Sequence, residues 1–273
     1  MAGEVCELPY DVMNSEEARE LAKDKPHSFL HVSKPEIDLE PGIDVHSPAV
    51  YAKGAENFRF LQEQGILLED SSPCYYLYQQ VMAGHKQVGV VAVASCEEYD
   101  SGIIKKHEYT RPAKEDDRVN HIESLNSQTG PVFLTYRAMA EIDAFVEGAC
   151  NKDPDVDFEA VDGVRHTSWV LGSKEEMDFL KEQFEKVDFL YIADGHHRSA
   201  AASRVNASRQ GAGQSSRFLS VIFPHDQMQI LAYNRAVKTL NGITPQTFLE
   251  QLGNVFDINE SEGGICGGKN EIC

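Results

Sequence analysis

Apolar runs of strand length alternate along the chain with stretches whose apolar positions recur at helical spacing. The strand-length runs are bounded by glycine, proline or polar clusters, which is typical of strands in a folded sheet. They cover 29–32, 66–68, 74–82, 87–94, 132–136, 166–171, 189–193, 218–223 and 228–233. The turn at 83–86 predicts one hairpin, and the turn at 224–227 predicts a second.

Helices are predicted where capping residues precede amphipathic or alanine-rich stretches. Ser173 and Glu176 have the spacing of a capping box, and Thr244-Pro245 is a typical helix start. The predicted helices cover 16–23, 49–64, 173–186, 199–205 and 245–252, and irregular segments are expected at 35–48, 150–163 and 206–216. This order of strands and helices indicates an α/β (α+β mixed) fold, with a mixed sheet and flanking helices.

The stretch 189–205 predicts a strand, a tight turn and a helix in succession. Residues 189–193 are apolar, and Asp194-Gly195 is a turn signal because glycine adopts backbone angles that other residues avoid. Residues 199–205 are alanine-rich and contain neither glycine nor proline. We therefore expect the helix to begin within two residues of His197.

The polar residues of this turn are suited to an anion. A helix start presents unpaired N–H groups and the positive end of the helix dipole, so Gly195 and the residues after it could hold a phosphate. Arg198 adds a planar fork for phosphate or carboxylate, and His197 could donate to a phosphate oxygen. Asp194 and His196 are candidate catalytic groups. The alternative is a surface turn with solvated histidines. Because Arg198 stands at a helix start, we expect Arg198→Ala to leave folding nearly intact.

A second group of charged residues occupies 105–121. Its members Arg111, Lys114, Arg118 and His121 recur at spacings of three and four, so in a helix they would line one face and could contact a phosphate. Glu108 is a further candidate base, and Glu115 and Asp117 are candidate Mg²⁺ ligands. We predict that this segment lies beside the turn at 194–198. The alternative is a solvated, charged helix face.

Composition restricts the partners. The 273 residues carry 44 acidic and 25 basic side chains, a net charge of −19, which disfavours nucleic acid and is easier to reconcile with a small phosphorylated ligand. No apolar run reaches eighteen residues and no basic-then-apolar leader precedes the chain, so we expect a cytoplasmic protein without membrane contact. The six cysteines lack Cys-x-x-Cys spacing, which favours reduced thiols over zinc. Neither haem nor flavin is predicted, and no oligomeric state is indicated.

Several of these motifs resemble one protein family. Ile192-Ala193-Asp194-Gly195-His196-His197-Arg198, followed by an alanine-rich helix, is similar to the signature of the bacterial and archaeal domain-of-unknown-function family 1015. Pro9-Tyr10-Asp11-Val12, the segment 28–32 and the segment 106–121 match the same family. The resemblance implies one family domain over 1–257, either undivided or split into 1–104 and 105–257. It also implies an irregular tail at 258–273 and a truncated chain.

A more distant resemblance suggests an activity. The turn is similar to the phosphate-binding loop of the ParB/sulfiredoxin superfamily, which includes free-serine kinases, and this implies a ParB/sulfiredoxin-like core. It also implies ATP or ADP with Mg²⁺ as the donor, and phosphoryl transfer involving serine or phosphoserine. One alternative is a ParB-like nucleotide- or DNA-linked binding module, which net acidity and the lack of a helix-turn-helix pattern disfavour. Another is a metal-dependent phosphohydrolase, although adjacent histidines on a turn rarely share one ion.

Overall fold

An eight-stranded mixed sheet forms the framework of the molecule. The computed structural model describes residues 2–231 and 238–258, and the chain divides into two compact units, Met1–Met228 and Gln229–Cys273. All eight strands belong to the first unit. They are β1 (Tyr75–Met82), β2 (His85–Ser95), β3 (Ile104–Lys105), β4 (Val132–Tyr136), β5 (Val156–Glu159), β6 (Arg165–Leu171), β7 (Leu190–Asp194) and β8 (Arg217–Pro224), in the spatial order β3-β7-β4-β8-β2-β1-β6-β5.

Strand β8 joins two sets of strands that come from different parts of the chain. It pairs antiparallel with β2, where Ala92 faces Ser220, and parallel with β4, where Leu134 faces Ile222. On one side of β8 lie β4, β7 and β3, and on the other lie β2, β1, β6 and β5. Strands before and after residue 104 therefore belong to the same sheet.

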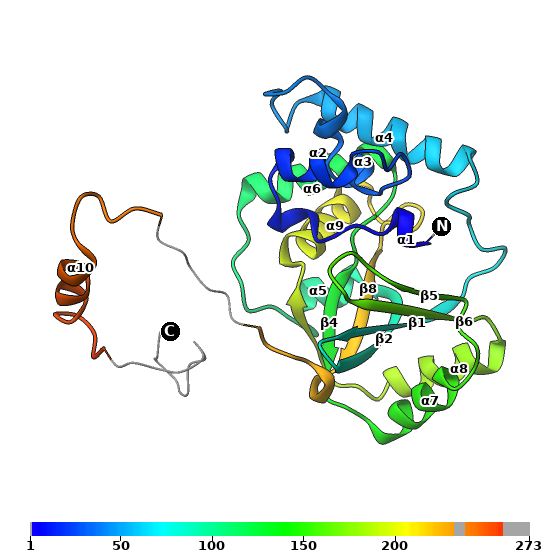
Figure 1. Cartoon of the computed structure of the whole chain (residues 1–273). Helices are drawn as coiled ribbons and strands as arrows, with labels where there is room; N and C mark the ends of the chain where they lie inside the picture. Colours follow the sequence, from blue (N-terminus) through cyan, green and yellow to red (C-terminus); the bar gives the residue numbers. More distant parts are fainter. Residues whose placement is uncertain (1, 232–237, 259–273) are drawn as a thin grey trace. The chain divides into compact units, whose positions relative to one another are not determined.

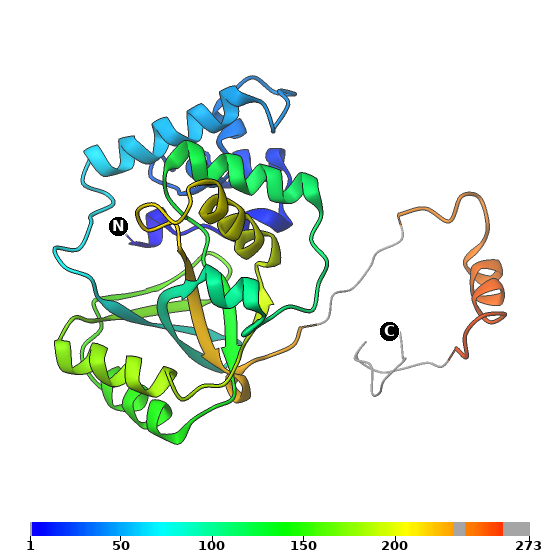
Figure 2. The ribbon, with the colours of Figure 1, turned by 180° about the vertical axis from the view of Figure 1, so that it is seen from behind.

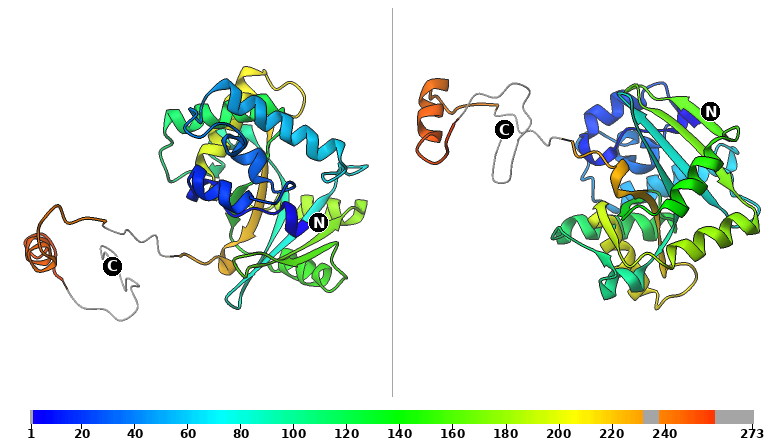
Figure 3. Two further views of the ribbon diagram at one scale, coloured as in Figure 1. Left: turned by 45° about the horizontal axis from the view of Figure 1, so that its top comes forward. Right: turned by 90° about the horizontal axis from the view of Figure 1, so that it is seen from below.

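Helices flank this sheet at its two ends. They are α1 (Ala2–Val5), α2 (Ser15–Ala22), α3 (Leu30–Ser33), α4 (Pro48–Glu63), α5 (Cys96–Ser101), α6 (Pro112–Leu125), α7 (Ala140–Cys150), α8 (Lys174–Phe184) and α9 (His196–Ser208), with 3₁₀ turns η1 (Tyr10–Val12), η2 (Pro35–Asp38) and η3 (His225–Gln227). Helices α4, α6 and α9 lie side by side (Figures 1 and 2), whereas α7 and α8 pack together at the other end (Figure 1). The N-terminal turn α1 lies against β5 (Figure 3).

The core follows the alternation of the strands. Leu77, Leu134 and Ile192 are each at most 1% exposed and point into one apolar cluster, which Ile142 of α7 and Leu180 of α8 also join. Burying each such side chain stabilises the fold by about 1.5–3 kcal/mol. Because β4 and β7 are anchored in this cluster, the turn that follows β7 is held in a defined position.

Most of the predicted elements are confirmed. The first hairpin, the strands near 132–136, 166–171, 189–193 and 218–223, and the capped helices at 15–22, 174–184 and 245–252 are present. Helix α10 (Pro245–Leu252), in the second unit, is capped by Thr244, whose side chain accepts a hydrogen bond from the Thr247 N–H. No described helix is long and apolar enough to span a bilayer.

Three strand predictions are wrong in the described residues. Residues 30–33 form α3, because a short apolar run does not distinguish a strand from a buried helix turn. At 66–68 the chain turns instead, since the N–H groups of Ile66 and Leu67 both donate to the Leu61 carbonyl. Residues 228–231 form no strand after η3, and 232–233, the rest of that predicted strand, lie outside the described residues. Most of the predicted tail, 259–273, also lies outside them. Helices α5 and α7 and strand β5 were not predicted.

Candidate functional site

The turn after β7 has the predicted strand–turn–helix geometry. Gly195 has a φ of 93°, in the left-handed region, and α9 begins at His196. The Ser199 N–H donates to the Gly195 carbonyl at 2.9 Å, so the N–H groups of residues 196–198 precede the first intrahelical bond. No side chain caps this helix start. The start of α9 can therefore donate hydrogen bonds to an anion.

The loop at 106–111 lies directly on this helix start. The rings of His107 and His196 are perpendicular, with centroids 4.4 Å apart. The Arg111 backbone N–H donates to Nε2 of His197 at 3.2 Å. Since Nε2 of His197 accepts, the proton of its neutral ring is on Nδ1. The prediction that the segment around 107–121 lies beside the turn is thus confirmed, although more than eighty residues separate Arg111 from His197.

His196 is a buried, neutral imidazole. It is 4% exposed, and its Nε2 has no hydrogen-bond partner among the described residues. Burial lowers the pKa of His196, and the neighbouring His107 lowers it further, whereas the charges of Glu108 and Asp194 oppose both effects. Glu108 directly follows His107, whose ring contacts His196, and Asp194 precedes His196 by two residues. The three candidate catalytic groups, Asp194, Glu108 and His196, are therefore gathered at one place.

Arg198 connects the turn to two other segments. Its guanidinium donates to the Pro131 carbonyl and to the Asp194 carboxylate, and lies 3.8 Å from Oδ2 of Asp11. The side chain is only 18% exposed. A Cβ on Gly130 would lie 3.2 Å from Cδ of Arg198, so a side chain there would crowd this arginine. These contacts argue against the expectation that Arg198→Ala leaves folding nearly intact, because the donors of Arg198 hold the turn against its surroundings.

Arg118 and His121 lie next to Arg198, on the inner side of α6. The Arg118 guanidinium pairs with Asp117 and lies 5.1 Å from the centre of the Tyr10 ring. His121 is 4% exposed and hydrogen-bonds the Val32 carbonyl at 3.0 Å through Nε2. Burial, aided by the charge of Arg118, lowers the pKa of His121 to about 4. Together with Tyr10 and Arg198 they line a cavity of about 20 Å³, enough for roughly one water molecule.

The other charged residues predicted at 111–117 either are exposed or are already paired. Arg111 and Lys114 are exposed at the start of α6. Glu115 accepts from Arg204 of α9 at 3.1 Å, and Asp117 accepts from the Tyr51 hydroxyl at 2.9 Å. Within residues 2–231 and 238–258, no three His, Cys, Asp or Glu side chains gather in a way that could hold a metal ion. Glu115 and Asp117 thus connect α6 to α9 and α4.

Comparison with known sequences now identifies the family. The family model described as "Protein of unknown function (DUF1015)" matches residues 1–271. The chain belongs to the DUF1015 family. No curated protein and no solved structure is significantly similar to it. The likeness of its turn to the ParB/sulfiredoxin phosphate loop therefore stays a prediction.

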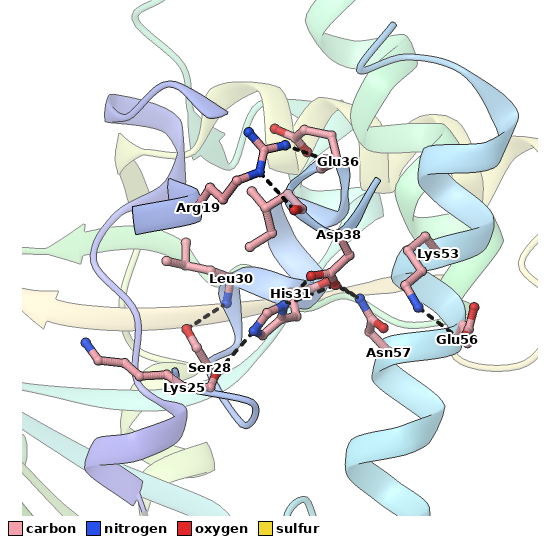
Figure 4. Close-up of polar contacts among 11 residues, drawn as sticks. Arg19, Lys25, Ser28, Leu30, His31, Glu36, Asp38, Lys53, Glu56 and Asn57 are labelled. Carbon is pink, nitrogen blue, oxygen red and sulfur yellow. Dashed lines mark hydrogen bonds and ion pairs between the residues drawn. The ribbon is translucent and has the colours of Figure 1, made fainter. Parts of the chain in front are cut away.

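Another matched motif of this DUF1015 chain, residues 28–32, has a structural role (Figure 4). Nδ1 of His31 lies 2.8 Å from Oδ1 of Asp38, and Nε2 lies 3.1 Å from the Lys25 carbonyl. Asn57 of α4 donates at 2.7 Å both to Asp38 and to the His31 carbonyl. Because both ring nitrogens face acceptors, the ring is satisfied as an imidazolium, and the hydrogen bond to Asp38 raises the pKa of His31. This network fixes α3 and η2 against α4.

Sequence reasoning missed four contributors to the site of this DUF1015 protein. One is His107, whose ring contacts His196. Tyr10 and Asp11 reach Arg118 and Arg198 from the N-terminal segment, and the Pro131 carbonyl accepts from Arg198. Tyr10 and Asp11 belong to the motif at 9–12 that resembles the family, and that motif was the available signal. Nothing in the local sequence marks the Pro131 carbonyl as an acceptor, because any residue supplies that group.

Proposed function

We propose that this DUF1015 chain binds a phosphorylated small molecule at the start of α9 and catalyses phosphoryl transfer there. The observation that supports the proposal is the contact between the loop 106–111 and the uncapped start of α9, through His107 on His196 and Arg111 on His197. The N–H groups of 196–198 and Nδ1–H of His197 supply donors for a phosphate. A local anion site of this kind is compatible with a chain whose net charge is −19.

Glu108 is the best-placed general base. Its side chain is exposed, and it makes no hydrogen bond or ion pair with the described residues. Asp194 is instead paired with Arg198, so its role in the proposal is to position that arginine. In the transfer step the acceptor hydroxyl oxygen attacks phosphorus while Glu108 takes the hydroxyl proton. The bond to the donor oxygen breaks, and that oxygen keeps the electron pair.

The donor and acceptor are proposed from the superfamily resemblance. ATP or ADP with Mg²⁺ would supply the phosphoryl group, the ion being held mainly by phosphate oxygens and water. Serine is the proposed acceptor. Hydrolysis of phosphoserine would need the same anion site, so either direction of chemistry can be tested on the same protein.

Binding and turnover measured on paired variants test the proposal. ATP, ADP, tripolyphosphate and phosphoserine are screened by thermal shift, since a ligand at a hundred times its Kd stabilises the folded state by about 2.7 kcal/mol. His197→Ala should weaken binding of the stabilising ligand about tenfold. Glu108→Gln should retain binding and lose at least about a hundredfold in turnover with serine.

Glu147→Gln, a change at an exposed position of α7, is the matched control and should behave like the unchanged protein. The proposal fails if none of the four ligands shifts the melting temperature. It also fails if Glu108→Gln keeps full turnover.

A further inference from the structure

A groove near the beginning of β7 takes no part in the proposed phosphoryl transfer. It has a volume of about 540 Å³ and lies between the residues that follow β4 and the segment that joins α8 to β7. Its lining includes Arg137, Met139, Lys186, Asp188, Phe189 and Tyr191. Tyr191 precedes Asp194 by three residues, a separation of about 10 Å along a strand. The groove is thus a separate feature from the turn at 194–198.

Two aromatic rings of this groove are unusually open to solvent. Phe189, which precedes β7, is 42% exposed, and Tyr191 within β7 is 37% exposed. The next residue of the strand, Ile192, is buried. Nζ of Lys105 lies 4.0 Å from the centre of the Phe189 ring. Lys105 is also the partner of Tyr191 in the parallel pairing of β3 with β7. A flat ring could therefore stack here beside a positive charge.

The groove is locally basic on a strongly acidic chain. Arg137, Lys186 and Lys105 form no ion pair with the described residues, and Lys186 makes one hydrogen bond, to the neutral side chain of Gln183 at 3.0 Å. The one carboxylate in the lining is that of Asp188, so positive side chains outnumber negative ones at this place. The chain as a whole carries 44 acids against 25 bases. Positive side chains without partners favour an anionic ligand.

We propose that this groove binds a small molecule that carries both an aromatic ring and an anionic phosphate or carboxylate group. The ring stacks on Tyr191 and Phe189, and the anionic group pairs with Arg137 and Lys186. The volume is in the range of small-ligand pockets, about 300–1,000 Å³. The ring stacking and the anion pairing do not depend on the phosphoryl-transfer proposal, since none of these residues contacts the start of α9.

Calorimetric titration of the whole chain with AMP tests the proposal, because AMP combines a ring with a phosphate. Adenosine supplies the ring alone and ribose 5-phosphate the anion alone, and both should bind at least about tenfold more weakly than AMP. Arg137→Gln, an exposed substitution, should weaken AMP binding about tenfold. Tyr191→Thr should do the same, with circular dichroism to confirm that the variant is folded.

Two further variants locate the effect. Lys181→Gln removes an exposed charge from α8 outside the groove and should leave AMP affinity unchanged. His197→Ala distinguishes the groove from the start of α9, because it should not remove the AMP binding that depends on Arg137. The groove proposal is overturned if AMP does not bind at about 10 mM, or if AMP binds no better than both fragments. It is also overturned if His197→Ala abolishes AMP binding while Arg137→Gln leaves it intact. That last result would support an anion site at α9 alone.

Discussion

The most direct test of the turn is the substitution Gly195→Ala. Gly195 has a φ of 93°, and a Cβ at this position would lie 3.2 Å from Cζ of Arg198 and 3.3 Å from Cα of Val132. Val132 Cα is backbone held in β4, so it cannot move away easily. Arg198 could shift, but only by losing its bonds to Pro131 and Asp194.

The expected loss of stability has two parts. A left-handed backbone conformation costs an L-residue about 1–2 kcal/mol, and forcing a methyl group into a filled site typically costs about 1–3 kcal/mol. Lower entropy of the unfolded chain offsets about 0.4–1 kcal/mol of this. We therefore expect Gly195→Ala to reduce the free energy of unfolding by about 2–3 kcal/mol, which corresponds to a decrease in Tm of roughly 5–10 °C.

Urea unfolding of Gly195→Ala and Gly84→Ala, measured side by side, separates the backbone strain from the steric crowding. Gly84 has a φ of 82° in the hairpin turn, but a Cβ there would meet nothing within 4 Å. Gly84→Ala should therefore cost only the backbone strain, about 1 kcal/mol. If both variants lose the same stability, the close contacts around Gly195 contribute nothing. If Gly195→Ala is as stable as the unchanged protein, the geometry of the turn is misinterpreted altogether.

Three further substitutions have defined outcomes. Arg198→Ala should lower the free energy of unfolding by about 1 kcal/mol in urea, because the hydrogen bonds to the Pro131 carbonyl and the Asp194 carboxylate are lost; an unchanged midpoint would contradict this. Asp38 raises the pKa of His31, so the stability that this pair contributes is complete below the ordinary value of 6.5 and is lost as pH rises through the raised pKa. Asp38→Asn should lower the pKa of His31 in an NMR titration, and an unshifted titration would refute the pairing. For His121, whose pKa is lowered to about 4, the unfolded chain takes up the proton first. Stability therefore falls as pH drops from 6.5 towards 4, by up to about 3 kcal/mol. His121→Gln should reduce this acid dependence in urea unfolding at several pH values, and an equal dependence in both proteins would count against it.

Local chemistry was sufficient to predict the turn but not its partners. The apolar run before Asp194, the glycine and the alanine-rich stretch determine a strand, a turn and a helix within a few residues, and that geometry is present. The type of side chain at Arg198 suggested a free fork for phosphate, yet Asp194 and a carbonyl some seventy residues earlier in the chain occupy it. Such a contact depends on how β4 and β7 pair, which periodicity does not specify.

The missed and misassigned elements have similarly physical causes. Helix α7 begins after Met139, which offers no side-chain cap, so its start lacks the capping signal that marked the predicted helices. The segment 30–33 is short and apolar, and its helical turn is selected by burial of Leu30 and Val32 in two different clusters. In both places tertiary packing, which a single sequence does not reveal, decides the local conformation.

The position of β8 has a consequence for how the chain reaches its folded state. Among the described strands it is the last in chain order, yet it is the one that holds the two halves of the sheet together. Until residues 217–224 are available, β2 and β4 each present an unpaired edge, and such edges can pair with other chains. The closing pairs, such as Ala92 with Ser220, are far apart in sequence, which makes this step slow compared with formation of the hairpin. Because α9 immediately precedes β8, the proposed anion site and the closed sheet should be completed almost together, late in synthesis of the first unit.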